Sequence, residues 1–268
     1  MMIEAIRNRR SVRTFDGRMI EESLLMQLQE YAVQIENPWG IKTEFVFLDA
    51  KENGLSSPVL SGEPMYITVK ALKCQHMEEA CGYAFEKLML KAVEMGLGTV
   101  WIGGTMKREL FEAASRKSDE ERMPCITPIG YPAKMSFKER MMRKGVGADT
   151  RKKNDELFFE NDLGTPLKIS EMMLHDAFEA VRLAPSAVNK QPWRIVYKDG
   201  LYHFYEKKAK GYVSDEVGDM QKIDIGIAIC HFDLTVSEYG KKTQLIIEDP
   251  GIACPEDIEY IASLRIIE

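Results

Sequence analysis

The spacing of apolar residues along the chain predicts alternating helices and strands. Residues 2–9 and 21–34 have apolar side chains at helical spacing and predict two short amphipathic helices. Residues 43–50 and 65–72 are dense in β-branched and aromatic residues, and each segment predicts a strand. Short strands are also expected at residues 99–104 and 124–132.

Residues 77–96, "MEEACGYAFEKLMLKAVEMG", are apolar on nearly every face. A helix with so few polar faces is usually buried at the centre of a protein or in an interface between subunits. Glycines at 96 and 98 can end this helix. The sequence therefore predicts a central helix with little exposed surface.

A change in composition divides the chain into two parts. Residues 146–166, "VGADTRKKNDELFFENDLGTP", are highly charged and weakly periodic, and they predict a connector between an N-terminal half, 1–145, and a C-terminal half, 167–268. The second half begins again with a helix at 168–183, followed by strands at 193–199 and 201–207.

The two halves resemble each other at two places. "GYAFEKLMLKAVEMG" (82–96) and "GIAICHFDLTVSEYG" (226–240) have glycines, an alanine, a leucine and a glutamate at the same spacing. Upstream, "AVQIENPWGIKTEFVFLD" is similar to "AVRLAPSAVNKQPWRIVYKD". Two similar pairs in the same order indicate a diverged duplication. Each apolar helix would then be covered by its pseudo-symmetric copy, as in an isologous dimer, so we expect an α+β chain folded as one pseudo-dimeric body.

Composition narrows the class of protein. The 268 residues, 45% hydrophobic and 29% charged, indicate a soluble globular protein with a substantial core. A net charge of −6 argues against a general nucleic-acid binder. Five cysteines without a CxxC pair and without an export signal indicate a reducing compartment, so we expect a cytoplasmic protein. No apolar run reaches the roughly 18 residues that a membrane span needs. The four histidines lack metal-ligand spacing, and we expect no metal.

Two segments contain more directed hydrogen-bonding groups than a turn requires. The first is "RNRRSVRTF" at 7–15, in which an extended backbone would direct Arg9, Ser11 and Arg13 to one side. Arginine guanidinium groups match phosphate or carboxylate oxygens. The alternative is a solvated basic turn at the C-terminus of a helix, where cations are favourable.

The second segment is the link "LAPSAVNKQPWR" at 183–194. A capped turn between a helix and a strand explains Pro185 and Ser186, but it does not require Asn189 or Gln191. Asparagine and glutamine carry donors and acceptors together, which suits the mixed edge of a heterocyclic ring.

Together, "RRSVRTF", "GLGTVWIGG" after the central helix, and "APSAVNKQPW" resemble the nitroreductase family of FMN enzymes. Members of that family are α+β homodimers that bind FMN at the subunit interface. In this chain the motifs are divided between the halves, and the pattern resembles the divergent double-length nitroreductases. Two incomplete sites would then combine into one complete site within one polypeptide, which we expect to be a monomer.

The resemblance implies roles for the first half. Arg9, Arg10 and Ser11 would hold the FMN phosphate and ribityl chain, and Arg13 would lie near the pyrimidine end of the ring. Either Gly103 or Gly104 would offer a backbone N–H to flavin N5. Arg143 and Lys144 would complete the phosphate site, with Arg140 as a substitute.

In the second half the resemblance implies that Pro185, Ser186, Asn189 and Gln191 reach the ring edge and the ribityl chain. It also implies an oxidoreductase that takes a hydride from NADH or NADPH through flavin N5 and reduces electron-poor aromatic or quinone-type acceptors in a ping-pong cycle. No catalytic acid or nucleophile is then expected, because the flavin carries the chemistry. A non-catalytic flavin-binding, storage or sensing protein, and a scaffold that has lost its cofactor, remain alternatives.

Overall fold

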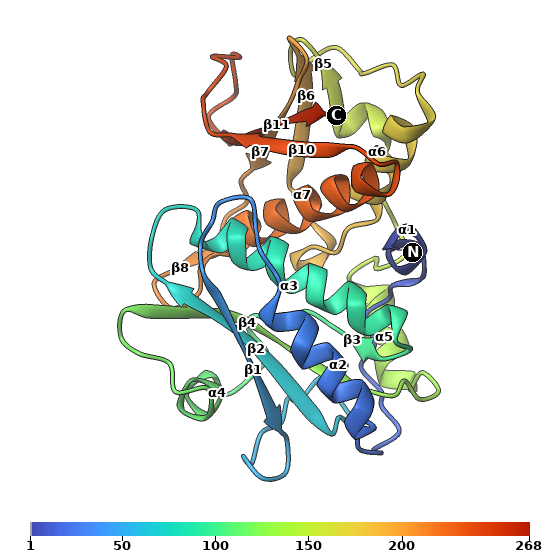
Figure 1. The fold of residues 1–268 in the computed structure, drawn as a ribbon, viewed down its shortest axis with the longest axis vertical. Coiled ribbons are helices and arrows are strands. Elements are labelled where there is room, and N and C mark those ends of the chain that lie inside the picture. Colours follow the sequence, from blue (N-terminus) through green and yellow to red (C-terminus); the bar gives the residue numbers. More distant parts are fainter. Residues whose placement is uncertain (1) are drawn as a thin grey trace.

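The computed structural model describes residues 2–268 and has two halves, one above the other in Figure 1, that meet along a pair of long helices. In the first half a four-stranded sheet has the order β1-β2-β4-β3. The helices of this half and its strands have the following bounds: α1 (Met2–Asn8), α2 (Glu22–Val33), β1 (Thr43–Asp49), β2 (Met65–Leu72), α3 (Met77–Glu94), β3 (Gly98–Thr99), α4 (Arg108–Ala114), β4 (Glu121–Gly130) and α5 (Phe137–Gly145).

The second half contains a five-stranded sheet in the order β10-β11-β7-β6-β5 and a small two-stranded sheet, β8-β9. Its elements have these bounds: η1 (Asn154–Glu156), β5 (Phe158–Glu160), α6 (Met172–Leu183), η2 (Ala187–Asn189), β6 (Trp193–Lys198), β7 (Leu201–Lys207), β8 (Val213–Ser214), β9 (Gly218–Asp219), α7 (Met220–Glu238), β10 (Lys242–Ile246) and β11 (Ile258–Ile267).

Both sheets are mixed, and each packs on one of the central helices. The first sheet is antiparallel along its paired strands, but Ser11 adds a parallel bridge to Thr99 at the β3 edge. In the second sheet β5 and β6 are parallel and the other pairs are antiparallel. The predicted α+β class is confirmed, with α3 on the first sheet and α7 on the second.

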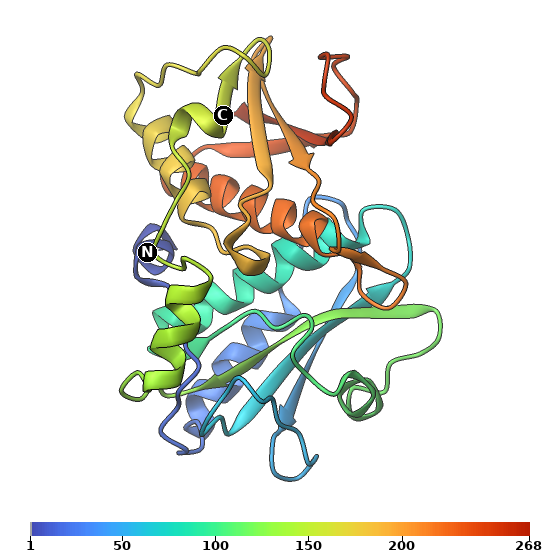
Figure 2. The ribbon, with the colours of Figure 1, turned by 180° about the vertical axis from the view of Figure 1, so that it is seen from behind.

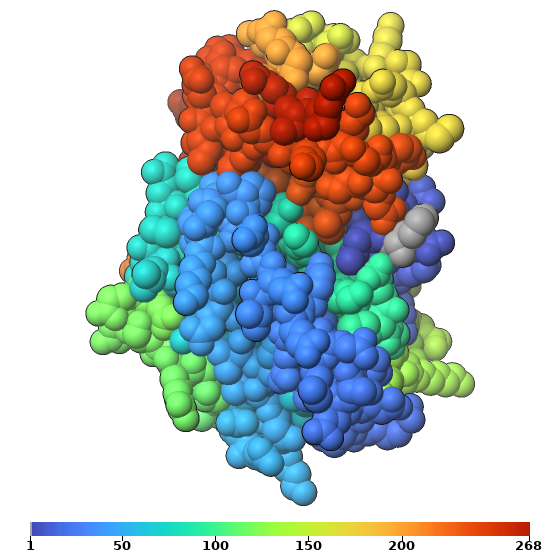
Figure 3. All heavy atoms as spheres, in the orientation of Figure 1, coloured from blue at the N-terminus to red at the C-terminus, as the bar shows by residue number. Residues whose placement is uncertain are grey.

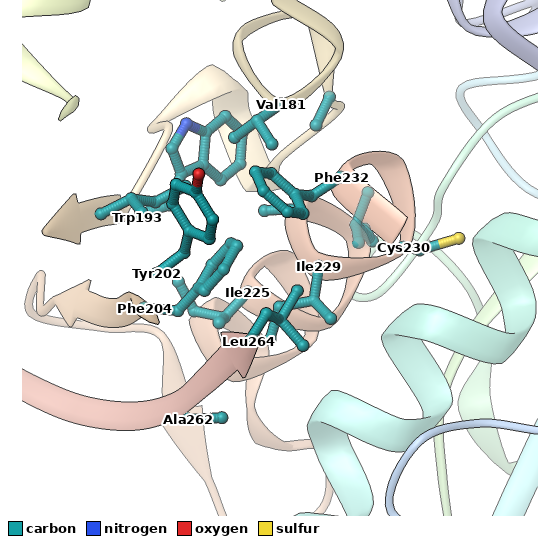
Figure 4. Packing of buried hydrophobic residues seen from close by; sticks show 14 of the residues in the cluster. Val181, Trp193, Tyr202, Phe204, Ile225, Ile229, Cys230, Phe232, Ala262 and Leu264 are labelled. Atoms are coloured by element: carbon teal, nitrogen blue, oxygen red, sulfur yellow. The ribbon is translucent and has the colours of Figure 1, made fainter. Parts of the chain in front are cut away.

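The core of the second half is aromatic. Trp193 and Phe204 from the sheet and Phe232 from α7 point toward one another in Figure 4, and each is fully buried. Tyr83 of α3 joins the same cluster and its hydroxyl donates to Asp233 of α7, so the core extends across the boundary between the halves. The space-filling view in Figure 3 shows the halves in continuous contact along this boundary.

The two central helices cross at the glycines that the sequence comparison aligned. A Cβ atom on Gly82 would lie 2.1 Å from the carbonyl oxygen of Ile223, and one on Gly226 would lie 2.0 Å from the carbonyl oxygen of Glu79. Each glycine therefore meets the residue that precedes the other by about one helical turn. The contact is reciprocal, as a pseudo-two-fold axis between α3 and α7 requires, and only glycine allows the backbones to approach so closely.

Several elements differ from the sequence-based expectations. The strand expected at 99–104 is short: the Val100 N–H donates to the Thr127 hydroxyl of β4 at 3.1 Å instead of to a backbone carbonyl, and pairing resumes only at Ile102, opposite Ile126. The basic run after β4 forms α5, with Ser136 as its N-cap. The helix expected at 168–183 begins at Met172. The patterns did not predict α4, β10 or β11.

The segment 146–166 contains regular structure. After α5 the chain runs from the first half to the second, as Figure 2 shows from behind, and Phe158–Glu160 then pairs with β6 as an edge strand. Residues 158–160 therefore share the sheet of the second half. Phe158 is fully buried there, which explains the "ELFF" sequence inside an otherwise charged segment.

Candidate functional site

Arginines from three separate segments of the chain gather where the two halves meet. Arg9 follows α1, Arg13 lies four residues later, Arg143 is in the last turn of α5, and Arg151 follows α5. The pKa of Arg9 is lowered by burial and by the charge of Arg143, although Glu86 raises it. Burial also lowers the pKa values of Arg13 and Arg151, and Arg9 and Arg143 lower both further. These four residues, here called the arginine cluster, therefore repel one another at short range.

Several donors in the arginine cluster have no acceptor. The buried side-chain atoms without a hydrogen-bond partner include Nε and Nη1 of Arg9, Nη1 of Arg13 and Nε of Arg151. The Arg9 side chain is only 5% exposed. A buried guanidinium donor without a partner is costly, and buried like charges add to this cost. A dianionic phosphate would accept these hydrogen bonds and neutralise the charge, so the residues present fit the phosphate of FMN.

Two carboxylates, those of Glu139 and Asp149, contact arginines in and beside the arginine cluster. Glu139, 2% exposed on α5, accepts from Thr14 Oγ1 at 2.8 Å and lies 3.5 Å from Nη1 of Arg10. Asp149 pairs with Arg143. Each arginine has one carboxylate within ion-pair distance, and Nη1 of Arg10 also lacks a hydrogen-bond partner, but the Arg9 side chain is 5% exposed and that of Arg10 is 39% exposed. The sequence assigned both arginines to the phosphate without distinguishing them.

Glu86 lies behind Arg9 in a buried network that joins the halves. Its Oε1 is 3.9 Å from Nε of Arg9 and 2.9 Å from Nε2 of His231, and its Oε2 accepts from the Trp101 indole N–H at 2.7 Å. Burial raises the pKa of Glu86, but these contacts outweigh burial and the pKa lies below its usual value. Nδ1 of His231 lies 2.8 Å from the Ala180 carbonyl. Sequence patterns assigned no role to Glu86, because a glutamate at helical spacing reads as a surface residue.

Ser11 lies at the edge of the first sheet. It bridges to Thr99 in parallel, and the following N–H, that of Val12, donates to the Thr99 carbonyl at 2.9 Å. A Cβ atom on Gly98 would lie 2.8 Å from Cγ1 of Val12, so β3 needs glycine where the "RRSVR" segment passes. This pairing holds the segment extended and places it against the strand that leads to Gly103.

The link between α6 and β6 is strained and tied to the segment after α5. Val188, Asn189 and Gln191 all have positive φ, at 50°, 55° and 51°. Ser186 Oγ accepts from the Gln191 N–H at 2.9 Å and so closes the turn. Left-handed backbone at three residues other than glycine, including β-branched Val188, is unfavourable and is typical of functional segments.

The amides of the link bind the backbone of 147–152. Asn189 Nδ2 donates to the Gly147 carbonyl at 2.7 Å, and its Oδ1 accepts from Arg151 at 3.4 Å. Gln191 Oε1 accepts from the Lys152 N–H at 2.8 Å. The structure thus brings the link from the second half to the arginine cluster. It does so through Arg151, which sequence reasoning missed because the residue lies in a charged run that was assigned to a connector.

The other expected basic residues lie further out. Arg140 and Lys144 are exposed and line an outer hollow of about 470 Å³ together with Arg143, whose charge also lowers the pKa values of Arg9 and Arg13. Of the three basic residues proposed to complete the phosphate site, Arg143 is therefore the one that the structure brings to Arg9 and Arg13.

The glycine turn after β3 lies against the second half. A Cβ atom on Gly103 would lie 2.9 Å from Cε of Met220, at the start of α7, whereas nothing lies within 4 Å of the corresponding position on Gly104. The turn is fixed from its other side by Arg108, which donates to the Gly103 carbonyl at 2.7 Å. The backbone at Gly104 is accordingly open to a ligand.

These elements match a known family. The family model described as "Putative TM nitroreductase" matches residues 1–236, and the chain belongs to this family of nitroreductase-like oxidoreductases. Among solved structures it is similar to a "putative nitroreductase" from Thermotoga maritima, with 24% identity and a TM-score of 0.64 over 98% of this chain and 92% of that one. Both halves of this chain therefore have counterparts in that fold. No curated protein matches the chain.

Two further solved structures cover about half of the chain. An FMN-dependent nitroreductase from Clostridium difficile has 22% identity and a TM-score of 0.44 over 50% of this chain and 89% of that one. Iodotyrosine deiodinase bound to FMN and 3-iodo-L-tyrosine has 19% identity and a TM-score of 0.43 over 51% of this chain and 92% of that one. Among residues 2–268, no helix is long and apolar enough to cross a membrane.

Proposed function

We propose that the chain is an FMN-dependent NAD(P)H oxidoreductase with one flavin site assembled from both of its halves. The observation that carries the proposal is the set of buried guanidinium donors on Arg9, Arg13 and Arg151 that have no acceptor. Arg9 and Arg13 precede α5 in the chain and Arg151 follows it, and Arg151 donates to Asn189 in the link of the second half. A phosphate monoester on a larger ligand is the group that this arrangement fits best.

The residues divide into two groups by the part of FMN that they would hold. Arg9, Arg143 and Arg151 bind the phosphate, and Ser11 adds a hydroxyl beside β3. Arg13, which the resemblance had assigned to the pyrimidine end of the ring, joins the phosphate group in this proposal because the charges of Arg143 and Arg9 act on it. Arg10 supports this group from the side through its contact with Glu139.

In the second half, Pro185 and Ser186 shape the wall along the ring and ribityl chain. Asn189 and Gln191 hold the segment that carries Arg151, and in this way they contribute to phosphate binding from the opposite half. The glycine turn supplies a backbone N–H to the ring, with Gly104 the more accessible of its two glycines. Lys144 and Arg140 contribute long-range positive charge from the outer hollow.

When bound, FMN would supply the redox chemistry, by which a hydride from NADH or NADPH would pass through N5 to an electron-poor aromatic or quinone-type acceptor in a ping-pong cycle. The protein orients the ring, places positive charge near the phosphate and limits access. A non-catalytic role in flavin storage or sensing is the competing proposal, and it predicts a bound flavin that NADH and NADPH do not reduce.

We also propose that the halves arose by duplication and that the chain is a monomer. The reciprocal contact of Gly82 and Gly226 supports a pseudo-dimer, because each central helix is covered by its counterpart. The five cysteines are all unpaired, which supports a reducing compartment such as the cytoplasm.

The test is to purify the protein, release any bound cofactor, identify it and count it per chain. About one FMN per chain, in a particle of monomer mass by light scattering, is expected. The bound flavin should lose its visible absorbance when NADH or NADPH is added without oxygen, and regain it with a quinone. A protein that takes up no FMN from excess cofactor would contradict the proposal, and a bound flavin that neither nucleotide reduces would favour storage or sensing.

A further inference from the structure

The glycine turn after β3 is held by an arginine outside the arginine cluster. Arg108 is the first residue of α4, and its guanidinium donates to the carbonyls of Gly103 at 2.7 Å, Pro124 at 3.4 Å and Met123. One side chain therefore ties the turn to β4 through three backbone acceptors.

Neither charge pairing nor helix stability accounts for an arginine at this position. Among residues 2–268, Arg108 forms hydrogen bonds with these carbonyls and no ion pair with a carboxylate. A cation in the first turn of a helix also opposes the helix dipole, which favours acidic residues there. The positive charge of Arg108 is therefore directed at the backbone of the turn.

The carbonyl that binds Arg108 belongs to the same peptide group as the Gly104 N–H. The Gly103–Gly104 peptide is trans, so its C=O and N–H point in opposite directions. Because the carbonyl points at Arg108, the N–H of Gly104 points away from it. That N–H has no acceptor among the described residues, and nothing lies within 4 Å of the place where a Cβ atom on Gly104 would be. It is a free and approachable donor.

The neighbouring N–H differs in its electrostatic setting. The carbonyl of Ile102, in the peptide that contains the Gly103 N–H, accepts from the neutral N–H of Ile126 at 2.9 Å. Of the two glycine N–H groups, only that of Gly104 belongs to a peptide whose carbonyl accepts from a charged guanidinium. A hydrogen bond at one end of an amide strengthens donation at the other end. Gly104 is therefore the stronger donor of the pair.

We infer that Arg108 is a positioning residue that polarises the Gly104 N–H toward the flavin ring and thereby raises the reduction potential of the bound flavin. The inference rests on the proposed function. The N–H presents the positive end of its dipole to the ring, and together with the charge of Arg108 it favours the form that has gained electrons. Because Arg108 does not touch the phosphate site, it should affect the potential more than the affinity for oxidised FMN.

The experiment compares three variants of the full chain loaded with FMN. Arg108→Gln keeps hydrogen-bond donors but loses the charge, and Arg108→Lys keeps the charge. Arg265→Gln removes one positive charge at an exposed position on β11, far from the turn, and serves as the control. The dissociation constant for oxidised FMN is measured by fluorescence titration, and the midpoint potential by equilibration with a reference dye.

For Arg108→Gln, we expect the preference for reduced over oxidised FMN to fall about tenfold, which equals about 30 mV for a two-electron couple. Its affinity for oxidised FMN should stay within about threefold of the wild type, because Arg108 does not touch the phosphate site. A threefold change is smaller than the tenfold change that corresponds to 1.4 kcal/mol. Arg108→Lys and Arg265→Gln should have potentials close to that of the wild type.

Two results would overturn the inference: a wild-type potential in Arg108→Gln, or equal losses in Arg108→Gln and Arg108→Lys, which would indicate a purely structural role. Neither result would affect the proposed function, because both are measured on protein that binds FMN. Failure of the wild type to bind FMN would instead contradict the proposed function.

Discussion

Replacing Arg9 by methionine should have opposite effects on cofactor binding and on the stability of the cofactor-free protein. Arg9 is almost fully buried, and its Nε and Nη1 atoms have no acceptor. Removing it deletes charge-assisted hydrogen bonds to the phosphate, which are worth about 1.5–3 kcal/mol. FMN should then bind about 10- to 150-fold more weakly, since 1.4 kcal/mol is a factor of ten.

Without cofactor the same change relieves a strained arrangement. Methionine fills most of the space, removes two unpaired donors and ends the repulsion with Arg143. Glu86 keeps its contacts with His231 and Trp101, so the substitution does not leave a buried carboxylate unpaired. The free energy of unfolding of the cofactor-free protein should stay within about 1 kcal/mol of the wild type or rise, because an unsatisfied buried donor costs about 1–3 kcal/mol.

The assay pairs FMN titration with urea unfolding of the cofactor-free chain, with Arg265→Met as the control for loss of one positive charge. The control should bind FMN like the wild type. Wild-type affinity in Arg9→Met would show that the arginine cluster does not bind the phosphate. A loss of several kcal/mol in stability without FMN would show that Arg9 is a structural residue.

Three further changes test other contacts. Asn189→Ala should weaken FMN binding about tenfold, the loss of one charge-assisted contact, by freeing the segment that carries Arg151; unchanged affinity by titration would contradict a site shared between the halves. Gly226→Ala should cost about 3 kcal/mol or more in chemical unfolding, because its methyl group would overlap the Glu79 carbonyl; a cost below about 1 kcal/mol would refute the close helix crossing. Glu206→Gln should stabilise the chain by about 3 kcal/mol more at pH 8 than at pH 4, and equal effects at both pH values would refute this.

The reason for the last prediction lies in the burial of Glu206. Burial, and to a lesser extent Asp219, raise its pKa from 4.5 to about 7, although Lys222 opposes this shift. The folded pKa lies above the unfolded one, so the contribution of Glu206 to stability is fully present below about pH 4.5 and is lost as the pH rises through about 7. Glutamine cannot ionise, and the variant should lack this loss.

Local patterns predicted the helices and strands that are long, buried and mostly apolar. The apolar runs of α3 and α7 predicted buried central helices, and the glycines that the two runs share, at 82 and 226, lie in the structure where the helices cross. The β-branched runs predicted β2, β6 and β7 nearly to their ends. Short or exposed elements such as α4 and β10 have mixed composition, and their formation depends on contacts with the rest of the fold.

The sequence by itself determined which chemical groups are present and which local segments hold them. An arginine-rich turn, a rigid amide-rich link and a glycine turn are readable because each depends on residue types and short-range backbone geometry. Only the tertiary structure decided which of these groups meet. It brought Arg151 from a charged segment to Arg9, placed Arg143 rather than Lys144 at the cluster, and set Arg108 behind Gly103. Electrostatic and hydrogen-bond contacts act over a few ångströms in space, and Arg9 comes that close to Arg143 and Arg151, more than a hundred positions away, only in the folded chain.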